Sequence, residues 1–427
     1  MRDVIAMILA GGRVEELAAL TQARPKAAVP FGGQYRFIDF ALSSVAHSDI
    51  GRVGVLSQYR PSSLIDHLGT GEPWDLVGRG RGVKLLPPFV ADAQSHWYRG
   101  TADAVYQNLH FVRRHKPRDV LVLSGDHVYR MDFRPIVEAH RKSGADLTMV
   151  VKDMDPELGR GRFGFAEVDA GGRVVGYEEK PERPRSRLAS LTMYLFRTEV
   201  LEARLEENAR TGSSFQLYSE VLPAMLGRDH VRAHRHDGYW SYARSVDAYH
   251  QAHMDLLGER PAIDLARWEI RSRAEHAGLG DPAPVWCASA ARCQDCVLSP
   301  GVRVEGEVRR SVLSPGVRVE AGAVVTDSVL LHDAVVRSGA RVDRAVVDKF
   351  GVIGERAVVG EGPCEGANRA LPDAIRGGVS LVGKGAEVPS GRRVGRNCLV
   401  EMGVQAGDWR APALESGASL GRAGGVS

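Results

Sequence analysis

A nine-residue stretch, Val297-Leu298-Ser299-Pro300-Gly301-Val302-Arg303-Val304-Glu305, decides the fold of the last third of the chain, because it recurs unchanged at Val312–Glu320, fifteen residues further on. A repeat of about this length fits a coil of three short strands. Valines then recur every six residues, the hexapeptide spacing of a parallel β-helix, at Val382, Val388, Val394 and Val400. An antiparallel sandwich would instead require strict alternation and hairpin turns, which the sequence lacks. The pattern therefore predicts a left-handed parallel β-helix over residues 286–405.

The first part of the chain, residues 1–255, alternates short apolar runs with helical patterns. The runs are Val4–Ala10, Val53–Leu56, Val120–Leu123, Leu147–Val151 and Met193–Phe196. Continuous apolar strands of this kind are buried on both faces, so they indicate an α/β, Rossmann-like domain with a mainly parallel sheet covered by helices. Ligands of such sheets bind beyond the carboxyl ends of the strands. We therefore expect functional residues at Gly11-Gly12-Arg13 and at Ser124–His127.

Two further segments are predicted from composition. Residues 256–285 mix a short helical pattern with Gly and Pro, which is typical of a linker. Residues 406–427 are rich in Gly, Ala, Ser and Arg, and we expect a flexible tail there.

Composition also limits the partners. Lys and Arg (56) nearly balance Asp and Glu (53), so the net charge of +3 provides no overall field for nucleic acid or an anionic membrane. No apolar stretch approaches the roughly 20 residues of a membrane span. Five cysteines do not indicate a disulfide framework, so a soluble cytoplasmic protein is expected. Cys293 and Cys296, preceded by Cys287, lack a second pair at zinc spacing, which favours buried free thiols over a metal site.

Seven motifs occur in one order along the first domain. They are Leu9-Ala10-Gly11-Gly12-Arg13, Arg24-Pro25-Lys26, Phe31-Gly32-Gly33, Tyr35–Phe40, Trp97–Ala104, Ser124–His127 and Glu179-Lys180-Pro181. Together they closely resemble the ADP-glucose pyrophosphorylases (glucose-1-phosphate adenylyltransferases), whose second domain the predicted β-helix also resembles. The resemblance implies the reaction of ATP with glucose 1-phosphate to give ADP-glucose and pyrophosphate, in glycogen biosynthesis. It also implies a cytoplasmic homo- or hetero-tetramer, and we expect the subunits to associate through the β-helix.

The resemblance further implies roles for individual residues. Backbone N–H groups around Gly11 and Gly12 can approach phosphate closely, and Thr101 is expected to cap a helix. Lys26 and Asp126 are the implied catalytic residues, with Asp126 as a Mg²⁺ ligand. The implied nucleotide-binding residues are Leu9, Ala10, Gly11, Gly12, Tyr98, Gly100, Thr101 and Ala102. Those for the sugar phosphate are Glu179, Lys180 and Ser190.

Four positions depart from the family pattern, all of them near the chemistry. Glu16, beside Glu15, replaces an Arg of the phosphate loop, and a carboxylate there is expected to repel the triphosphate. Tyr242 replaces the Asp that would be the second Mg²⁺ ligand. The stretch Leu217–Glu220 lacks a sugar-phosphate lysine, and Thr192 replaces a Gly that leaves room for the hexose. These changes predict impaired catalysis.

Three functions are therefore compared. The first is a catalytic or weakly catalytic adenylyltransferase, supported by Lys26, Asp126 and Lys180. The second is a non-catalytic regulatory subunit or sugar-phosphate sensor that partners a catalytic paralogue. The third, a hexapeptide acyltransferase, would need His332 as its catalytic base, and the resemblance speaks against it. Four arginines of the β-helix could bind an anionic effector, but solvent-facing positions are the favoured interpretation for Arg303, Arg309, Arg310 and Arg318.

Overall fold

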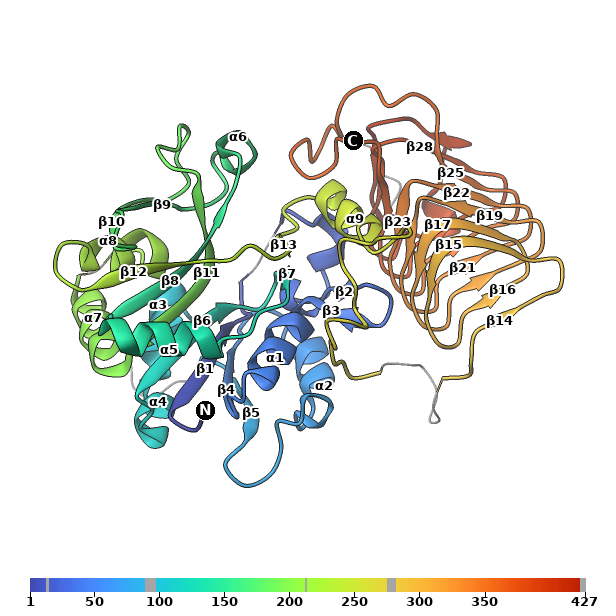
Figure 1. The fold of residues 1–427 in the computed structure, drawn as a ribbon. Helices are drawn as coiled ribbons and strands as arrows, with labels where there is room; N and C mark the ends of the chain where they lie inside the picture. The colour runs from blue at the N-terminus through green and yellow to red at the C-terminus, as the bar shows by residue number, and fades with distance from the viewer. Residues whose placement is uncertain (13–14, 89–96, 212, 275–281, 423–427) are drawn as a thin grey trace. The chain divides into compact units, whose positions relative to one another are not determined.

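The computed structural model describes residues 1–12, 15–88, 97–211, 213–274 and 282–422. The chain forms two compact units (Figure 1). The first, called the sheet unit, comprises Met1–Gly12 and Ile38–Trp240, and the second, called the β-helix unit, comprises Arg13–Phe37 and Ser241–Ser427. This division cuts across the domain ranges given above, which stay predictions. No described helix is long and apolar enough to cross a membrane.

Nine of the described strands form the sheet of the sheet unit. They are β1 (Val4–Leu9), β4 (Arg52–Leu56), β5 (Gly82–Leu86), β6 (Asp119–Ser124), β8 (Leu147–Asp153), β9 (Phe165–Val168), β10 (Val174–Glu178), β11 (Leu188–Arg197) and β12 (Val231–Arg235). The order is β10-β9-β11-β6-β1-β4-β5, and β8 pairs with β11 and β12. The strands β6, β1, β4 and β5 are parallel, which confirms the predicted parallel core, whereas β11 runs antiparallel to β6 and β8.

Helices cover this sheet because alternate strand residues on each face are apolar. Ile5 and Met7 of β1 share one buried cluster with Val105, Leu109 and residues of β6. The helices are α1 (Phe37–His47), α2 (Ser62–Leu68), α3 (Thr101–Gln107), α4 (Leu109–His115), α5 (Arg134–Ser143), α6 (Pro156–Gly159), α7 (Thr198–Arg210) and α8 (Leu222–Met225). The α/β class predicted from the apolar runs is thus confirmed.

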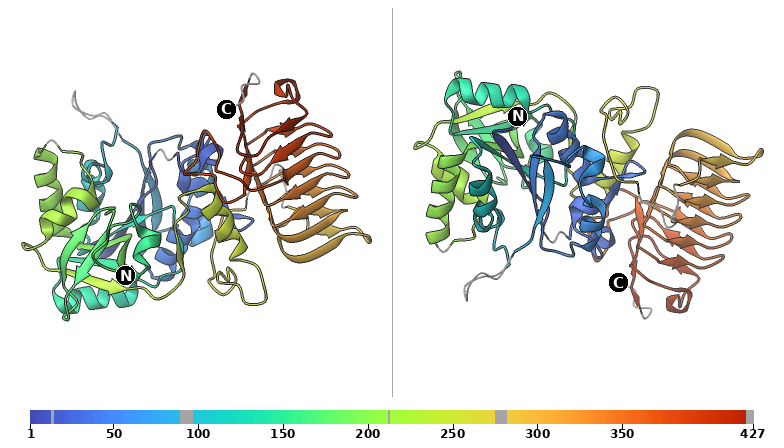
Figure 2. Two further views of the ribbon diagram at one scale, coloured as in Figure 1. Left: turned by 90° about the horizontal axis from the view of Figure 1, so that it is seen from above. Right: turned by 90° about the horizontal axis from the view of Figure 1, so that it is seen from below.

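The β-helix unit stacks short parallel strands as rungs (Figure 2). Its coils contain β14 (Trp286–Cys287), β15 (Arg292–Leu298), β16 (Arg303–Val304), β17 (Glu307–Leu313), β18 (Arg318–Val319), β19 (Val324–Thr326), β20 (Val329–Leu330), β21 (Val335–Val336), β22 (Arg341–Asp343), β23 (Ala345–Val347), β24 (Val352–Ile353), β25 (Val358–Glu361), β26 (Ser380–Val382), β27 (Glu387–Val388), β28 (Arg393–Gly395), β29 (Leu399–Val400), β30 (Ala413–Leu414) and β31 (Ser419–Leu420). The unit also holds α9 (Val246–Met254), β2 (Pro30–Phe31) and β3 (Tyr35–Arg36).

The sequence repeat coincides with the strand register. Val297 pairs with Val312, and Arg303 with Arg318, so the two copies of the nine-residue stretch lie on successive coils. The four valines at six-residue spacing are all buried, which confirms that they point into the core.

The chain end differs from the prediction. Instead of a flexible tail from residue 406, β30 and β31 pair with β28 and β29 and complete another coil. Leu414 and Leu420 are buried, so this Gly-rich stretch still supplies inward aliphatic side chains. Only residues 423–427 of the predicted tail lie outside the described part of the chain.

Candidate functional site

The loop after β1 is fixed between the ends of two neighbouring strands. Gly125 N–H donates to the Leu9 carbonyl (2.9 Å), and Ala10 N–H donates to the Leu56 carbonyl (2.9 Å). A Cβ on Gly11 would lie 2.9 Å from the backbone nitrogen of Gln58, so any larger residue would displace that segment. A Cβ on Gly12 would meet no described atom within 4 Å, which leaves its backbone open to a ligand. Arg13, the last residue of the motif, lies outside the described residues.

Tyr98 is attached to the same loop through Gln58. Tyr98 N–H donates to Gln58 Oε1 (2.7 Å), and Gln58 Nε2 donates to the Tyr98 carbonyl (3.3 Å). The Tyr98 hydroxyl donates to the Leu86 carbonyl (2.7 Å) and accepts from Asn108 (2.8 Å). Burial raises the pKa of Tyr98 to about 12, so the phenol stays protonated. The sequence motifs did not reveal Gln58, because nothing local marks a glutamine after a strand.

Gly100–Ala102 begin α3, as expected, but Thr101 does not cap it. Gly100 occupies the N-cap, and Thr101 is the first helical residue. The Thr101 hydroxyl donates to Gln216 Oε1 (3.0 Å) and accepts from Leu217 N–H (2.9 Å), so it anchors the helix to a distant loop. A Cβ on Gly100 would collide with the Phe215 carbonyl, which explains the glycine.

Asp126 lies just beyond the carboxyl end of β6, where the fold rule places ligands. The Ser124 hydroxyl donates to Asp126 Oδ1, and His127 Nε2 lies 3.6 Å from the same oxygen. Trp240 Nε1 donates to His127 Nδ1 (3.3 Å), so the His127 proton is assigned to Nε2, facing the carboxylate. Magnesium in proteins is often held by only one or two carboxylates, with substrate phosphates and water as its other ligands. Among the described residues, no group of three or more His, Cys, Asp or Glu side chains could hold a metal.

Glu179 and Ser190 are linked by two phenols. Tyr177 donates to Glu179 Oε2 (2.7 Å), and the Tyr194 hydroxyl lies 3.0 Å from Ser190 Oγ. Burial raises the pKa of both tyrosines, so both remain hydrogen-bond donors. Lys180 is more open: its side chain is 45% exposed, and its Nζ lies 3.9 Å from Glu179 Oε1. The three implied sugar-phosphate residues therefore lie along one polar network.

Two of the departures from the family pattern lie beside this network. Thr192 has a φ of 52° at an irregularity in the pairing of β11 with β8. The backbone there has the conformation that glycine prefers, although the residue is β-branched. Tyr218 directs its ring toward Lys180 Nζ, 5.7 Å away, on the stretch that lacks the second lysine. Both changes add bulk where the family pattern has small or cationic groups.

Lys26 belongs to the β-helix unit, where it forms a compact charged cluster. Its side chain is 2% exposed, and its Nζ lies 3.4 Å from the centre of the Tyr242 ring and 3.9 Å from Glu16 Oε2. Glu16 Oε1 accepts from Arg244 Nε (2.9 Å) and Nη2 (2.5 Å). The expectation that Glu16 repels the triphosphate is thereby corrected, because two cations, Lys26 and Arg244, already balance its charge. Tyr242 provides a cation–π surface for Lys26 in place of a metal carboxylate.

Of two further predictions from the sequence, the one on the cysteines was wrong and the one on the arginines of the coils was confirmed. Cys287 and Cys293 are exposed rather than buried, because β14 and β15 are outermost strands paired on one side only. All four arginines of the coils are exposed, as predicted, and two of them have local partners: Arg309 pairs with Glu307 (3.0 Å), and Arg310 pairs with Asp327 (2.9 Å).

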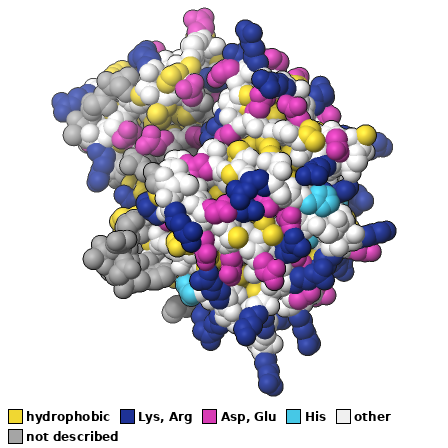
Figure 3. All heavy atoms as spheres, turned by 90° about the vertical axis from the view of Figure 1, so that its left-hand side faces the viewer, with side chains coloured by type: hydrophobic (Ala, Val, Ile, Leu, Met, Phe, Trp, Pro, Cys, Tyr) yellow, Lys and Arg dark blue, Asp and Glu magenta, His cyan; other side chains and the backbone are white. Residues whose placement is uncertain are grey.

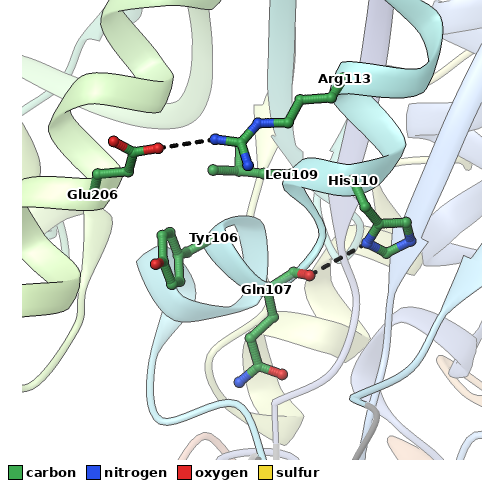
Figure 4. Close-up of a pocket in the computed structure, with 6 residues that line it drawn as sticks. All are labelled: Tyr106, Gln107, Leu109, His110, Arg113 and Glu206. Atoms are coloured by element: carbon green, nitrogen blue, oxygen red, sulfur yellow. Dashed lines mark hydrogen bonds and ion pairs between the residues drawn. The ribbon is translucent and has the colours of Figure 1, made fainter. Parts of the chain in front are cut away.

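A surface pocket of the sheet unit is lined by none of the site residues described above. Its volume is 540 Å³, and it is lined by Tyr106, Gln107, Leu109, His110, Arg113 and Glu206 (Figure 4). Arg113 and Glu206 form an ion pair of 2.9 Å across it. The face of the molecule in Figure 3 intermixes basic and acidic side chains, so charges of both signs are spread over it.

The fold and these motifs define a nucleotidyl transferase joined to a hexapeptide β-helix. Residues 5–259 match the nucleotidyl transferase family, and residues 286–382 match the GlmU-like C-terminal hexapeptide family. The glucose-1-phosphate adenylyltransferase of Thermomicrobium roseum is 44% identical over 98% of both chains. The proteins of the same name from Pseudothermotoga lettingae and Thermotoga neapolitana are 37% and 39% identical, again over 98% of both chains. The chain therefore belongs to the glucose-1-phosphate adenylyltransferase family.

Proposed function

We propose that this chain binds ATP and glucose 1-phosphate, or a related sugar phosphate, as an adenylyltransferase with weakened turnover. The observation that carries the proposal is the Lys26 cluster. Lys26 is buried against Tyr242 and beside Glu16, so a phosphate would have to displace a carboxylate before it could contact the ammonium group. Removing such preorganised cations from a transition state typically costs about 2.7 to 4 kcal/mol.

The binding residues, in contrast, remain available. Glu179, Lys180 and Ser190 keep a protonated phenol network and an exposed ammonium group for a sugar phosphate. Leu9–Gly12 keep a glycine whose backbone is open to a polyphosphate. Members of the family generally use a divalent metal ion. We propose Mg²⁺ for this chain, held by Asp126, which would polarise the phosphoryl oxygens when bound.

The direct test uses the purified chain with ATP, Mg²⁺ and glucose 1-phosphate. We expect calorimetry to detect sugar-phosphate binding, while coupled detection of pyrophosphate gives turnover below about 1 per second, the lower end of ordinary enzymes. Ordinary turnover would show that Lys26 reaches the phosphates despite Glu16. Failure to bind any sugar phosphate would remove the proposal altogether.

The same cluster favours a second function, that of a regulatory subunit or sugar-phosphate sensor that partners a catalytic paralogue in the cytoplasm, in glycogen biosynthesis. Assembly into a homo- or hetero-tetramer through the β-helix is supported by β14 and β15, each of which pairs on one side only among the described strands and lies at one end of the coils. Sedimentation of the pure chain and co-purification from its own cells would separate the assemblies. A monomer under both conditions would contradict this proposal.

A further inference from the structure

Four basic side chains of the sheet unit gather where β4 and β5 face α4. In the register of these strands Arg52 pairs with Gly82 and Gly54 pairs with Lys84, so Arg52, Gly54 and Lys84 share one face of the sheet. A Cβ on Gly54 would lie 3.3 Å from the Phe111 ring, which shows that α4 covers this face. His115 lies one helical turn after Phe111, with ring centroids 4.8 Å apart. The end of α4 therefore lies over Arg52 and Lys84.

The electrostatics of His115 are consistent with cations close to it. Partial burial and then the positive charges of Arg52, Arg114 and Lys84 lower the pKa of the imidazole. Among the residues that the structure describes, none of these three cations has a carboxylate partner. Arg113 on the same helix differs, because it pairs with Glu202 (3.3 Å) and with Glu206 (2.9 Å; Figure 4). The cluster is thus an uncompensated positive site.

Helix geometry explains only half of this arrangement. The macrodipole favours cations in the last turn of α4, which accounts for Arg114 and His115. Arg52 and Lys84 come from two strands and gain nothing from that dipole. Arg52 is the first residue of β4, so the cluster lies four residues, or roughly 13 Å, from the carboxyl end of that strand. It is therefore separate from the Leu9–Gly12 loop, which lies at the opposite edge of the sheet.

We propose that this basic cluster, formed by Arg52, Lys84, Arg114 and His115, binds a phosphate group, either as inorganic phosphate or as part of a phosphorylated metabolite. Two guanidinium groups and an ammonium group offer the number of donors that a tetrahedral dianion accepts. The imidazole offers one N–H donor when neutral and two when protonated. This binding site goes beyond the proposed function, because it requires neither ATP nor turnover.

The test follows the His115 ring by NMR in the full chain labelled with ¹³C-histidine, with the signal assigned by its absence in His115→Gln. Titration with inorganic phosphate should shift the signal saturably and raise the pKa of His115. A parallel titration with glucose 1-phosphate identifies the source: tighter binding indicates a metabolite, and equal or weaker binding indicates free phosphate.

Matched variants decide whether the cluster is the site. Lys84→Gln and Arg114→Gln should each weaken the His115 response about tenfold, the effect of losing one charge-assisted hydrogen bond. Arg113→Gln, which removes a paired arginine from the same helix, should leave it unchanged. A response that does not saturate, or one that Arg113→Gln weakens as much as Lys84→Gln does, would overturn the proposal. Pyrophosphate release plays no part in these readouts, so the proposed function is tested separately.

Discussion

Lys26 and Lys180 have nearly the same immediate neighbours but very different surroundings. Each ammonium group lies 3.9 Å from a glutamate oxygen, and each faces a tyrosine ring. Lys26, however, is 2% exposed and its ring is 3.4 Å away, whereas Lys180 is 45% exposed and its ring is 5.7 Å away. We therefore expect the two lysines to differ in function, because burial and neutralisation decide whether a ligand can reach an ammonium group.

The surroundings of the two lysines also differ in the partners that a ligand would have to displace. Around Lys180 the polar network is completed by neutral phenols, which can exchange their partners for sugar hydroxyls at small cost. Around Lys26 the partners are a carboxylate and a second cation, Arg244, which must be separated before an anion can enter. Charged partners in a desolvated place are expensive to separate.

The cost of burying charge in the β-helix unit can be measured at another pair. Arg24 Nη2 donates to both oxygens of Asp348 (2.9 and 2.8 Å), with side chains 4% and 0% exposed. Arg24→Met leaves Asp348 buried without its cation, and we expect a loss of about 3 to 5 kcal/mol in the free energy of unfolding by urea.

The control for this experiment is an exposed pair of the same unit. Arg393 and Glu361 are 64% and 48% exposed, so Arg393→Met should cost less than about 1 kcal/mol. Equal losses in the two variants would mean that burial does not set the strength of these pairs, and the explanation of the Lys26 cluster would fail with it.

Restoring the family residues tests the cluster directly. Glu16→Arg with Tyr242→Asp should raise pyrophosphate release by about 10² to 10³, or about 2.7 to 4 kcal/mol of transition-state stabilisation. Glu16→Arg alone should instead lower stability, because it places a third cation beside Lys26 and Arg244. The new carboxylate at position 242 relieves that repulsion, so the two changes are strongly non-additive.

Asp126→Asn in the double variant should abolish the gain, since Asp126 is the other proposed metal ligand and the carboxylate at position 242 would then have to hold the metal alone. A double variant no faster than the wild type would show that the cluster does not limit turnover. The thermal stability of each variant, measured in parallel, distinguishes a chemical loss from unfolding.

The sequence predicted the fold well where the signal was periodic. The repeat Val297–Glu305 predicted the coil register, and the apolar runs predicted β1, β4 and β6, because period and burial are properties of local sequence. It failed at the chain end, where the same six-residue spacing between Leu414 and Leu420 was overlooked within a Gly-rich stretch. Composition indicated disorder there, while two well-placed side chains were enough for another coil.

The candidate site was predicted as a set of residues but not as a set of contacts. Thr101 was expected to cap its own helix, yet its partners are Gln216 and Leu217, more than a hundred residues away. Arg244 was not among the predicted residues, because nothing in the local sequence indicates that it neutralises Glu16. Such pairings are decided by tertiary structure, which single-sequence patterns do not encode.

The two lysines can be compared by the same substitution. Lys180→Met should weaken glucose 1-phosphate binding about tenfold to a hundredfold, or about 1.5 to 3 kcal/mol, because an accessible charge-assisted hydrogen bond is lost. Lys26→Met should change the dissociation constant by less than about threefold, because Glu16 already neutralises the ammonium group of Lys26. Calorimetry measures both. Similar losses would show that both lysines contact the ligand and would remove the distinction between them.

Burial also affects the charge of a histidine in this unit, as His253 shows. His253 is fully buried in the β-helix unit, where Nδ1 faces the Tyr249 carbonyl (2.9 Å) and Nε2 accepts from Gly32 N–H (3.1 Å). Burial lowers the pKa of His253 to about 3, so the folded state holds it neutral, whereas the unfolded chain protonates it below its usual value near 6.5. The unfolded state then binds more protons, and the stabilisation that is complete above pH 6.5 is lost as the pH falls toward 3. At pH 5 the expected loss from this group is about 2 kcal/mol.

His253→Gln removes the titration, so its free energy of unfolding should fall less steeply between pH 6.5 and pH 5 than that of the wild type. Parallel curves for the two proteins would mean that His253 is protonated in the folded state, and that burial alone does not decide the charge of a base in this unit.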